Sequence, residues 1–400
     1  MKCAILSIGN ELIEGYVTNT NATYFSSKLN EIGIDVHVQL TVLDKEQDII
    51  DAINLLKIKH DLIIVSGGLG PTGDDITKES IAKALDLKLN INDNELNKLK
   101  EHFKQRNIEY KDVNSKQALF TSIDTILINN RGTANGYYFD KDNVSYCILP
   151  GPPVENRVMF DEYIKTLIKT EIYELDLYLT GIGESNAESM MLHLYDKYDE
   201  VFIGTYMQDF GINFRIRSSN KEQIRNCFNE LKEIFSAYYL CDSSKPIEVF
   251  VNQLIQEHIT ISFAESCTAG LACSLISQIS GVSSILNESH VTYANEAKEK
   301  YLNVSPITLQ NYGAVSEQCA KEMALGLAKL TSADLSISIT GIAGPNGGSI
   351  EKPVGTVYFA IAYKNNIYNY HQQFGGNRTL VQARAAKYII FEALRLVQHG

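Results

Sequence analysis

Near its beginning the chain reads Cys3-Ala4-Ile5-Leu6-Ser7-Ile8-Gly9, a continuous apolar run. Such a run is typical of a strand whose sheet is covered on both faces. Beyond it, strand patterns alternate with helical ones, the strands at 36–42, 61–65, 125–128 and 146–149 and the helices at 19–29, 46–57 and 76–85. This alternation predicts an α/β domain over residues 1–169, with a doubly wound, mostly parallel sheet.

Two changes of pattern divide the rest of the chain. Residues 170–245 predict a small α+β domain, with strands at 176–180, 201–205 and 212–218 and helices near 185–197 and 221–236. The polar stretch at 242–246 is interpreted as a hinge. Residues 246–400 predict a second α/β domain, with helices at 247–257, 268–279 and 378–398 and strands at 260–264, 289–293, 335–340 and 354–363.

The composition narrows the class of protein. The 400 residues are 44% apolar and 21% charged, which is ordinary for globular domains, and the formal net charge is -12. An acidic chain repels a phosphate backbone, so we expect no direct nucleic-acid binding, although one local nucleotide pocket is compatible with it. The seven cysteines match no zinc or redox spacing and are interpreted as reduced thiols. No signal-peptide pattern or apolar run of about 20 residues is present, so we expect a cytoplasmic protein without membrane contact.

A small polar turn, Ala264-Glu265-Ser266-Cys267-Thr268-Ala269-Gly270, joins a predicted strand to a predicted helix. Free backbone N–H groups and the helix dipole at such a junction stabilise a phosphate or a developing oxyanion. Ser266 is therefore a candidate nucleophile. The alternative is that Ser266 or Thr268 only caps the helix.

Two further motifs lie downstream. In Tyr293-Ala294-Asn295-Glu296-Ala297-Lys298, a lysine against an apolar wall would lose part of its preference for the charged form and could act as a base toward a serine. The alternative for Lys298 is a solvated surface lysine. Thr340-Gly341-Ile342-Ala343-Gly344-Pro345 follows an apolar strand, and its glycines would let the backbone approach a ligand closely.

Together with Lys352-Pro353-Val354-Gly355, these motifs resemble in type and order the C-terminal domain of the CinA (competence/damage-inducible protein A) family, over residues 247–400. The resemblance implies a nicotinamide mononucleotide deamidase that needs no metal. Its implied catalytic residues are Ser266 as nucleophile, Lys298 as general base, and Tyr293 and Thr340 in the site wall. Its implied substrate-binding residues are Glu265, Cys267, Thr268, Gly270, Asn295, Gly341, Gly344 and Arg378.

The chain departs from the family pattern at two positions. Ala269 stands where the family often has a second glycine, and we expect it to be tolerated. Gln382 stands where the family tends to have the second arginine of a pair, with Arg384 two residues further on. Arg378 is the candidate for phosphate binding, and its alternative is a solvated residue at the start of the last helix.

The N-terminal region carries its own motif, Ser66-Gly67-Gly68-Leu69-Gly70-Pro71-Thr72-Gly73-Asp74-Asp75. Its glycines can cradle a phosphate, and Asp74 and Asp75 could hold a divalent cation that bridges to it. The alternative is a helix start with favourable acidic residues.

This motif and several shorter ones resemble the CinA N-terminal domain, which is similar in turn to molybdopterin-binding domains. The resemblance implies a metal-dependent ADP-ribose pyrophosphatase with Asp74 and Asp75 on the metal. Its nucleotide site would comprise Gly9, Glu11, Asn21, Gly67, Gly68, Gly70, Thr72, Lys116, Gly151 and Glu155.

Three readings of the whole chain follow. The first is a two-site enzyme of pyridine-nucleotide salvage that acts on small nucleotides, with a homodimer expected from the resemblance. The second is a protein whose N-terminal domain binds a pterin or nucleotide without turnover. The third is an interaction protein linked to competence or DNA damage.

Overall fold

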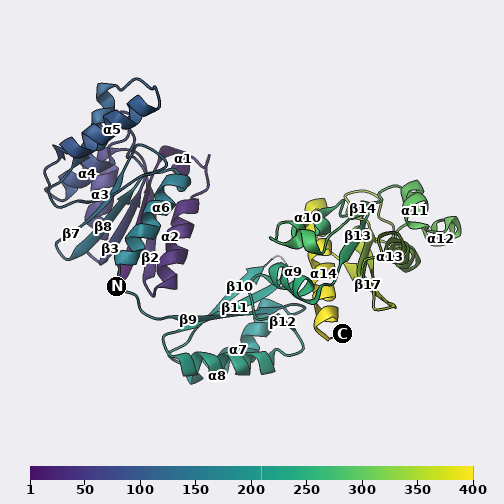
Figure 1. Cartoon of the computed structure of the whole chain (residues 1–400). Coiled ribbons are helices and arrows are strands. Elements are labelled where there is room, and N and C mark those ends of the chain that lie inside the picture. The colour runs from purple at the N-terminus through teal and green to yellow at the C-terminus, as the bar shows by residue number, and fades with distance from the viewer. Residues whose placement is uncertain (209, 400) are drawn as a thin grey trace. The chain divides into compact units, whose positions relative to one another are not determined.

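The computed structural model describes residues 1–208 and 210–399 (Figure 1). The chain divides into two compact units, Met1–Ile172 and Tyr173–Gly400. The predicted boundary at 169/170 lies close to this division. The boundary predicted at 245/246 falls inside the second unit and stays a prediction.

The first unit is built on a six-stranded sheet in the order β2-β1-β3-β8-β7-β6. Its strands are β1 (Lys2–Ile8), β2 (Asp35–Val42), β3 (Leu62–Ser66), β6 (Thr125–Leu127), β7 (Gly136–Lys141) and β8 (Val144–Leu149). The four strands from β2 to β8 are parallel, and β7 and β6 add an antiparallel edge. The predicted mostly parallel sheet is confirmed, although the sequence analysis did not identify β7.

Helices cover both faces of this sheet. One layer contains α2 (Thr20–Glu31) and α6 (Pro153–Tyr163), and the other contains α3 (Glu46–Leu56) and α4 (Thr77–Ala84). Alternate residues of β1 enter the two cores: Cys3 and Ile5 pack with the α2 and α6 side chains, while Ala4 and Leu6 pack with those of α3 and α4. Burial on both sides explains the continuous apolar run in the sequence.

Shorter elements complete the first unit. They are α1 (Asn10–Ile13), the small antiparallel pair β4 (Asn90–Ile91) and β5 (Leu119–Phe120), α5 (Asp93–Gln105) and the 3₁₀ helices Asp112–Ala118 and Ile164–Thr166. The side-chain oxygens of Asn19 and Asn92 accept hydrogen bonds at the starts of α2 and α5. The glycine turn, residues 67–75, follows the carboxyl end of β3 and leads into α4, so it lies at the carboxyl edge of the parallel strands.

The second unit begins with a four-stranded antiparallel sheet in the order β10-β11-β9-β12. Its elements are β9 (Tyr173–Leu179), α7 (Glu184–Lys197), β10 (Phe202–Gln208), β11 (Gly211–Ser218), α8 (Lys221–Ile234) and β12 (Tyr239–Cys241). Both helices cover one face, and Leu177, Phe214, Met191 and Phe228 share that core. The predicted small α+β arrangement is therefore present.

A five-stranded sheet follows in the order β14-β13-β15-β16-β17. Its strands are β13 (Ile261–Glu265), β14 (His290–Val291), β15 (Leu335–Gly341), β16 (Thr356–Tyr363) and β17 (Asn366–Gln373). The helices around it are α9 (Pro246–Glu257), α10 (Leu271–Ser277), α11 (Asn295–Leu302), α12 (Pro306–Tyr312), α13 (Glu317–Thr331) and α14 (Arg378–His399), with a 3₁₀ turn at Val282–Ser284.

The layers of this sheet place two of its loops at the same edge. Side chains of α9, α10 and α14 pack in one core, and those of α11 and α13 in another. Because β14, β13 and β15 are parallel, the turns that leave their carboxyl ends lie together. These are the turn that carries Ser266, the start of α11 and the glycine-rich turn after Gly341.

Among the described residues, no helix combines the length and the apolar character needed to cross a membrane.

Candidate functional site

Ser266 and Lys298 come together at the carboxyl end of β13. Ser266 follows the last residue of that strand, and Lys298 lies on α11, 32 residues later in the chain. The Lys298 Nζ lies 3.1 Å from the Ser266 Oγ. Both residues are buried, and the serine retains 8% exposure. The structure therefore joins a hydroxyl and an amine that the sequence analysis assigned to one mechanism.

Burial weakens the preference of Lys298 for its charged form. Its side chain is fully buried, and the Nζ donates to the carbonyl oxygens of Thr292 (2.8 Å) and Tyr293 (3.0 Å). Among the described residues no carboxylate pairs with it, and burial lowers the pKa of the amine below its ordinary value. A neutral amine can donate two N–H groups to the two carbonyls and accept the Ser266 proton on its lone pair. Lys298 is therefore not the solvated lysine of the alternative interpretation.

Glu265 has hydrogen-bond partners inside the protein. Its carboxylate is buried and accepts hydrogen bonds from the backbone N–H groups of Gly270 (3.0 Å), Ala272 (3.1 Å) and Cys273 (2.9 Å). These are the N–H groups that the start of α10 would otherwise offer to a ligand. Both oxygens of Glu265 thus hold the start of α10, and its predicted substrate contact stays a prediction.

The alternative of a serine or threonine cap is wrong. The N-cap residue of α10 is Gly270, without a side-chain cap hydrogen bond, and the helix begins three residues later than the predicted Thr268. Burial raises the pKa of the Cys267 thiol to about 12, so this thiol stays protonated beside the serine. The buried Thr268 hydroxyl has no hydrogen-bond partner in the described part of the chain.

Two backbone donors next to Ser266 are used by no other described residue, and the Cys267 N–H contacts its own thiol. Within the described residues, the amide N–H groups of Cys267 and Thr268 donate to no oxygen of another residue. The following amide, that of Ala269, donates to the Ser266 carbonyl at 3.1 Å. The two open donors lie one and two residues after the candidate nucleophile, where an oxyanion would form.

Ala269 adopts the left-handed backbone conformation, with φ of 53°. This conformation costs an alanine about 1–2 kcal/mol, and glycine adopts it freely. We expect Ala269→Gly to raise the free energy of unfolding by about 0.5–1 kcal/mol, after the greater freedom of glycine in the unfolded chain is subtracted. Urea denaturation measures it. The helical substitution Ala383→Gly should instead destabilise by about 1 kcal/mol, and equal losses in both variants would contradict the argument.

Arg378 lies at the start of α14. It connects the motif that contains Tyr293 to the glycine-rich motif that contains Gly344. Its guanidinium donates to the Gly344 carbonyl oxygen (2.8 Å) and to the Tyr293 hydroxyl (2.7 Å). Gly344 has a φ of +83°, and an added Cβ there would lie 2.5 Å from the Val354 side chain. Tyr293 is more than half exposed, so its hydroxyl and the guanidinium together form a polar, cationic rim.

Three other predicted site residues either make contacts within the protein or are exposed at its surface. The buried Thr340 hydroxyl donates to the Ala314 carbonyl oxygen at 2.7 Å, and its predicted place in the site wall stays a prediction. A Cβ at Gly341 would lie 2.7 Å from the Thr356 carbonyl oxygen, which explains this glycine by packing. Asn295 is exposed at the first position of α11.

The sequence analysis identified Gln382 only as a departure from the family pattern. The structure shows that its Nε2 donates to the Cys267 carbonyl oxygen at 2.7 Å. Arg384 lies away from the turn and donates to the Gly375 carbonyl oxygen.

The glycine turn of the first unit borders a cavity of about 470 Å³. Several predicted nucleotide-site residues line it together, namely Gly9, Glu11, Gly67, Gly68, Gly70, Asp74, Asp75, Gly151 and Glu155. An added Cβ at Gly67 would lie 2.0 Å from the Ile8 carbonyl oxygen, and one at Gly68 would lie 2.2 Å from the Thr77 hydroxyl. These two glycines are therefore required to pack the turn.

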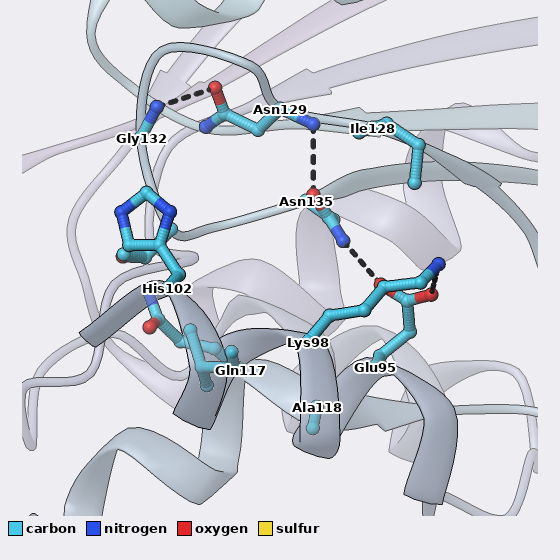
Figure 2. Close-up of a pocket in the computed structure, with 11 residues that line it drawn as sticks. Glu95, Lys98, His102, Gln117, Ala118, Ile128, Asn129, Gly132 and Asn135 are labelled. Carbon is cyan, nitrogen blue, oxygen red and sulfur yellow. Dashed lines mark hydrogen bonds and ion pairs between the residues drawn. The ribbon is translucent and has the colours of Figure 1, made fainter. Parts of the chain in front are cut away.

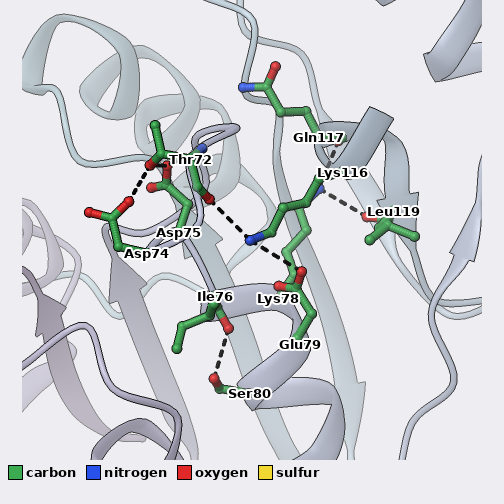
Figure 3. A network of polar contacts seen from close by, with 10 residues as sticks. All are labelled: Thr72, Asp74, Asp75, Ile76, Lys78, Glu79, Ser80, Lys116, Gln117 and Leu119. Atoms are coloured by element: carbon green, nitrogen blue, oxygen red, sulfur yellow. Dashed lines mark hydrogen bonds and ion pairs between the residues drawn. The ribbon is translucent and has the colours of Figure 1, made fainter. Parts of the chain in front are cut away.

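The two aspartates share a hydroxyl partner in this turn. Figure 3 shows the Thr72 Oγ1 between the carboxylates of Asp74 and Asp75, at 2.5 Å from an oxygen of each. Asp75 also accepts the Thr72 backbone N–H at 3.0 Å, and α4 begins at Thr77 without a side-chain cap. Neither carboxylate accepts a hydrogen bond from α4, and the alternative of acidic residues that favour a helix start through the helix dipole stays open. Lys116 donates to the Thr72 carbonyl oxygen from the far side of the turn.

The carboxylates around this cavity fit a hard divalent cation. Burial, followed by the charges of Glu11, Asp74 and Asp75, raises the pKa of Asp44, so four carboxylates repel one another around the cavity. Among the described residues no three His, Cys, Asp or Glu side chains converge enough to hold a metal. Two carboxylates completed by phosphate oxygens and water would be a typical magnesium site.

Asn21 lines a neighbouring cavity of about 300 Å³. Its Nδ2 donates to the Gly151 carbonyl oxygen at 2.7 Å, and Glu11 and Gly151 line both cavities. Asn21 therefore lines the cavity next to the one at the glycine turn, and does not line the cavity at the glycine turn itself.

Figure 2 shows a third, smaller cavity of about 110 Å³ that the sequence analysis missed. Asn135 accepts the Asn129 backbone N–H at 2.8 Å and donates to Glu95 at 2.7 Å, which ties the loop before β7 to α5. Asn129 also donates to Glu155, so the predicted Glu155 is held by this loop.

Lys78 on α4 is a second buried lysine that the sequence analysis missed. Its Nζ donates to the carbonyl oxygens of Gln117 and Leu119, both at 2.9 Å (Figure 3). It also lies 3.8 Å from the centre of the Phe120 ring. Burial lowers the pKa of Lys78 to about 7. Its contacts brace the segment that supplies Gln117 to two cavities.

The chain matches two described families, one in each half. Residues 4–170 match the family described as probable molybdopterin binding domain, and residues 244–398 match the CinA C-terminal domain.

Relatives match over nearly the whole length. A putative competence-damage inducible protein of Caldicellulosiruptor saccharolyticus is 37% identical over 398 residues, with 97% of each chain covered. One from Clostridium beijerinckii is 37% identical over 396 residues, covering 96% of this chain and 97% of the relative.

Solved structures match a smaller part of the chain. A CinA superfamily protein of Escherichia coli is 34% identical, with 40% of this chain and 93% of that chain covered and a TM-score of 0.37. A competence/damage inducible protein of Agrobacterium tumefaciens is 36% identical, with 38% and 95% covered and a TM-score of 0.36. The extent and identity of the full-length matches lead to one conclusion: the chain belongs to the CinA family of competence-damage-inducible proteins.

Proposed function

We propose that the second unit deamidates nicotinamide mononucleotide to nicotinate mononucleotide and ammonia. The observation that carries the proposal is the fully buried Lys298 amine, without a carboxylate partner among the described residues, 3.1 Å from the Ser266 hydroxyl. A buried serine–lysine pair suits acyl transfer, because burial lowers the pKa of the lysine and its neutral form can accept the serine proton.

In the proposed reaction, the Ser266 Oγ attacks the carboxamide carbon and its proton passes to Lys298. The charge that develops on the carboxamide oxygen is stabilised by the open N–H groups of Cys267 and Thr268. The C–N bond then breaks, Lys298 returns the proton, and ammonia leaves an acyl ester on Ser266. Water, deprotonated by the same amine, attacks this ester and releases nicotinate mononucleotide and the free serine.

The polar rim supplies a place for the nucleotide phosphate. Arg378 carries a permanent positive charge and is fixed at two points, by the Gly344 carbonyl and the Tyr293 hydroxyl. A fixed guanidinium suits phosphate recognition. The Thr268 hydroxyl, buried without a partner among the described residues, is available to the substrate closer to the serine.

The direct test is incubation of the purified protein with nicotinamide mononucleotide in the presence of EDTA. We expect ammonia and nicotinate mononucleotide in equal amounts, since no step uses a metal. Absence of both products from a folded sample would reject the deamidase.

We further propose that the first unit cleaves ADP-ribose to AMP and ribose 5-phosphate. The cavity of about 470 Å³ with its glycine turn and paired aspartates supports this second activity. Asp74 and Asp75 would hold a divalent cation, which when bound offsets the diphosphate charge and activates water. Lys116 and the backbone of the turn would position the diphosphate from the other side.

We expect Asp75→Asn to lower ADP-ribose cleavage roughly 100-fold or more, because several kcal/mol of charge stabilisation would be lost. Deamidation should be unchanged, since the two sites belong to different compact units. The exposed Asp51→Asn serves as a matched control. Isothermal titration with ADP-ribose and with molybdopterin accompanies the assay, and tight binding by the wild type without product would favour a binding module instead.

A further inference from the structure

Gln382 connects the closing helix α14 to the turn that carries the candidate nucleophile. Its Nε2 donates to the Cys267 carbonyl oxygen at 2.7 Å, and its side chain is half-buried. The neighbouring arginines of this helix have other partners: Arg378 contacts Gly344 and Tyr293, and Arg384 contacts Gly375. Gln382 thus supplies a side-chain hydrogen bond from α14 to this turn.

The Cys267 carbonyl and the Thr268 N–H belong to a single peptide unit. In a trans peptide these two groups point in opposite directions. Among the described residues the one cis peptide bond is Gly344–Pro345, so the Cys267–Thr268 bond is trans. A contact that holds the carbonyl oxygen toward α14 therefore directs the Thr268 N–H away from α14.

The Glu265–Ser266 peptide is held by neighbouring strands, since the Ser266 N–H donates to the Ile339 carbonyl oxygen, and the later carbonyls and amides of the turn find partners within the same segment. The Ser266 carbonyl accepts the Ala269 N–H, and the Thr268 carbonyl accepts the Leu271 N–H, both at 3.1 Å. The Gly270 N–H is held by Glu265. The Cys267–Thr268 peptide differs, because its oxygen is held from a distant element while its N–H is left open.

We infer that Gln382 is a positioning residue that orients the Thr268 N–H toward the oxyanion formed when Ser266 attacks the carboxamide. The inference rests on the proposed deamidation. A donor aimed at charge that develops during the reaction stabilises the transition state more than the bound substrate. Its loss therefore lowers kcat and leaves KM almost unchanged.

The kinetic test compares Gln382→Met, which keeps the side-chain length but removes the donor, with Gln398→Met at an exposed position of the same helix. We expect kcat for nicotinamide mononucleotide to fall about 10- to 100-fold in Gln382→Met. This is smaller than the effect of deleting an oxyanion donor, because the Thr268 N–H is misdirected and not removed. The KM should stay within about twofold of the wild-type value. The control should match the wild type. An unchanged kcat, or a higher KM with normal kcat, would overturn the inference.

A second test does not depend on turnover. The sequence contains a single Cys-Thr pair, Cys267-Thr268, so carbonyl-¹³C cysteine combined with ¹⁵N threonine labels this one peptide unit. Its NMR resonance should move in Gln382→Met and stay in place in Gln398→Met. An unmoved resonance would overturn the positioning role. A moved resonance in a protein that deamidates nothing would reject the proposed function and the catalytic use of the donor, while the orientation would stand.

Discussion

Replacing Ser266 by alanine is expected to lower deamidation of nicotinamide mononucleotide by at least about a thousandfold. The hydroxyl is the atom that would form the acyl ester, and nothing adjacent replaces it, since burial keeps the Cys267 thiol protonated. The binding contacts of Arg378 stay in place, so substrate should still bind. Ammonia release, compared with the binding affinity from isothermal titration, measures the two effects separately.

The matched control is Ser274→Ala, which removes an exposed hydroxyl from α10. Ser274→Ala should retain wild-type activity. Its unfolding temperature should equal that of Ser266→Ala. Turnover by Ser266→Ala within tenfold of the wild type would mean that another group attacks the carboxamide.

Replacing Lys298 by methionine is expected to cost about 10²- to 10⁴-fold in kcat, the usual contribution of a general base. Methionine has a similar length and is apolar, so the fold should tolerate it better than a buried amine. The double variant with Ser266→Ala should lose little more than either single variant, because the two groups act as a unit. Single-turnover measurements with excess enzyme report these rates. The control is Lys300→Met, two residues along the same helix and exposed.

The pH dependence tests the protonation state of the same lysine. Only the neutral amine accepts a proton, so kcat should rise as the pH increases through the Lys298 pKa. Burial lowers that pKa, which places the rise below the ordinary lysine value of 10.5. The shift has a second consequence: between the folded and the unfolded pKa the unfolded chain binds more protons, so this group adds stability as the pH rises. A rate that falls with pH throughout this window would contradict the base assignment.

The strand and helix alternation could be predicted because each element has a local period. The antiparallel strands β7 and β17 could not, and β17 shows why: it is an edge strand with polar residues such as Asn366, Asn369 and Gln373. The sequence analysis also assigned no helices to residues 295–331, where α11, α12 and α13 lie. The length of the closing helix, in contrast, agrees within one residue at its end.

The candidate site was predictable where a motif is continuous. Ser266 and Lys298 stand in short, distinctive stretches, and the structure brings them together. Glu265 was expected at the site only from the resemblance, and the hydrogen bonds of its carboxylate to the amides of Gly270, Ala272 and Cys273 became visible only in the structure. No local sequence pattern predicts the contact between Gln382 and Cys267, because it joins residues 115 positions apart.

The amides at the start of α10 are occupied by Glu265, and this affects how the site can change through evolution. Many proteins bind phosphate with main-chain amides, which no single codon change can replace. Here the buried Glu265 carboxylate occupies those amides, so the proposed function leaves phosphate recognition to side chains such as Arg378. Affinity for the charged end of a ligand is then open to point mutation at the rim, while the reacting pair beneath it stays intact. Descendants of this sequence could therefore acquire new carboxamide substrates one substitution at a time.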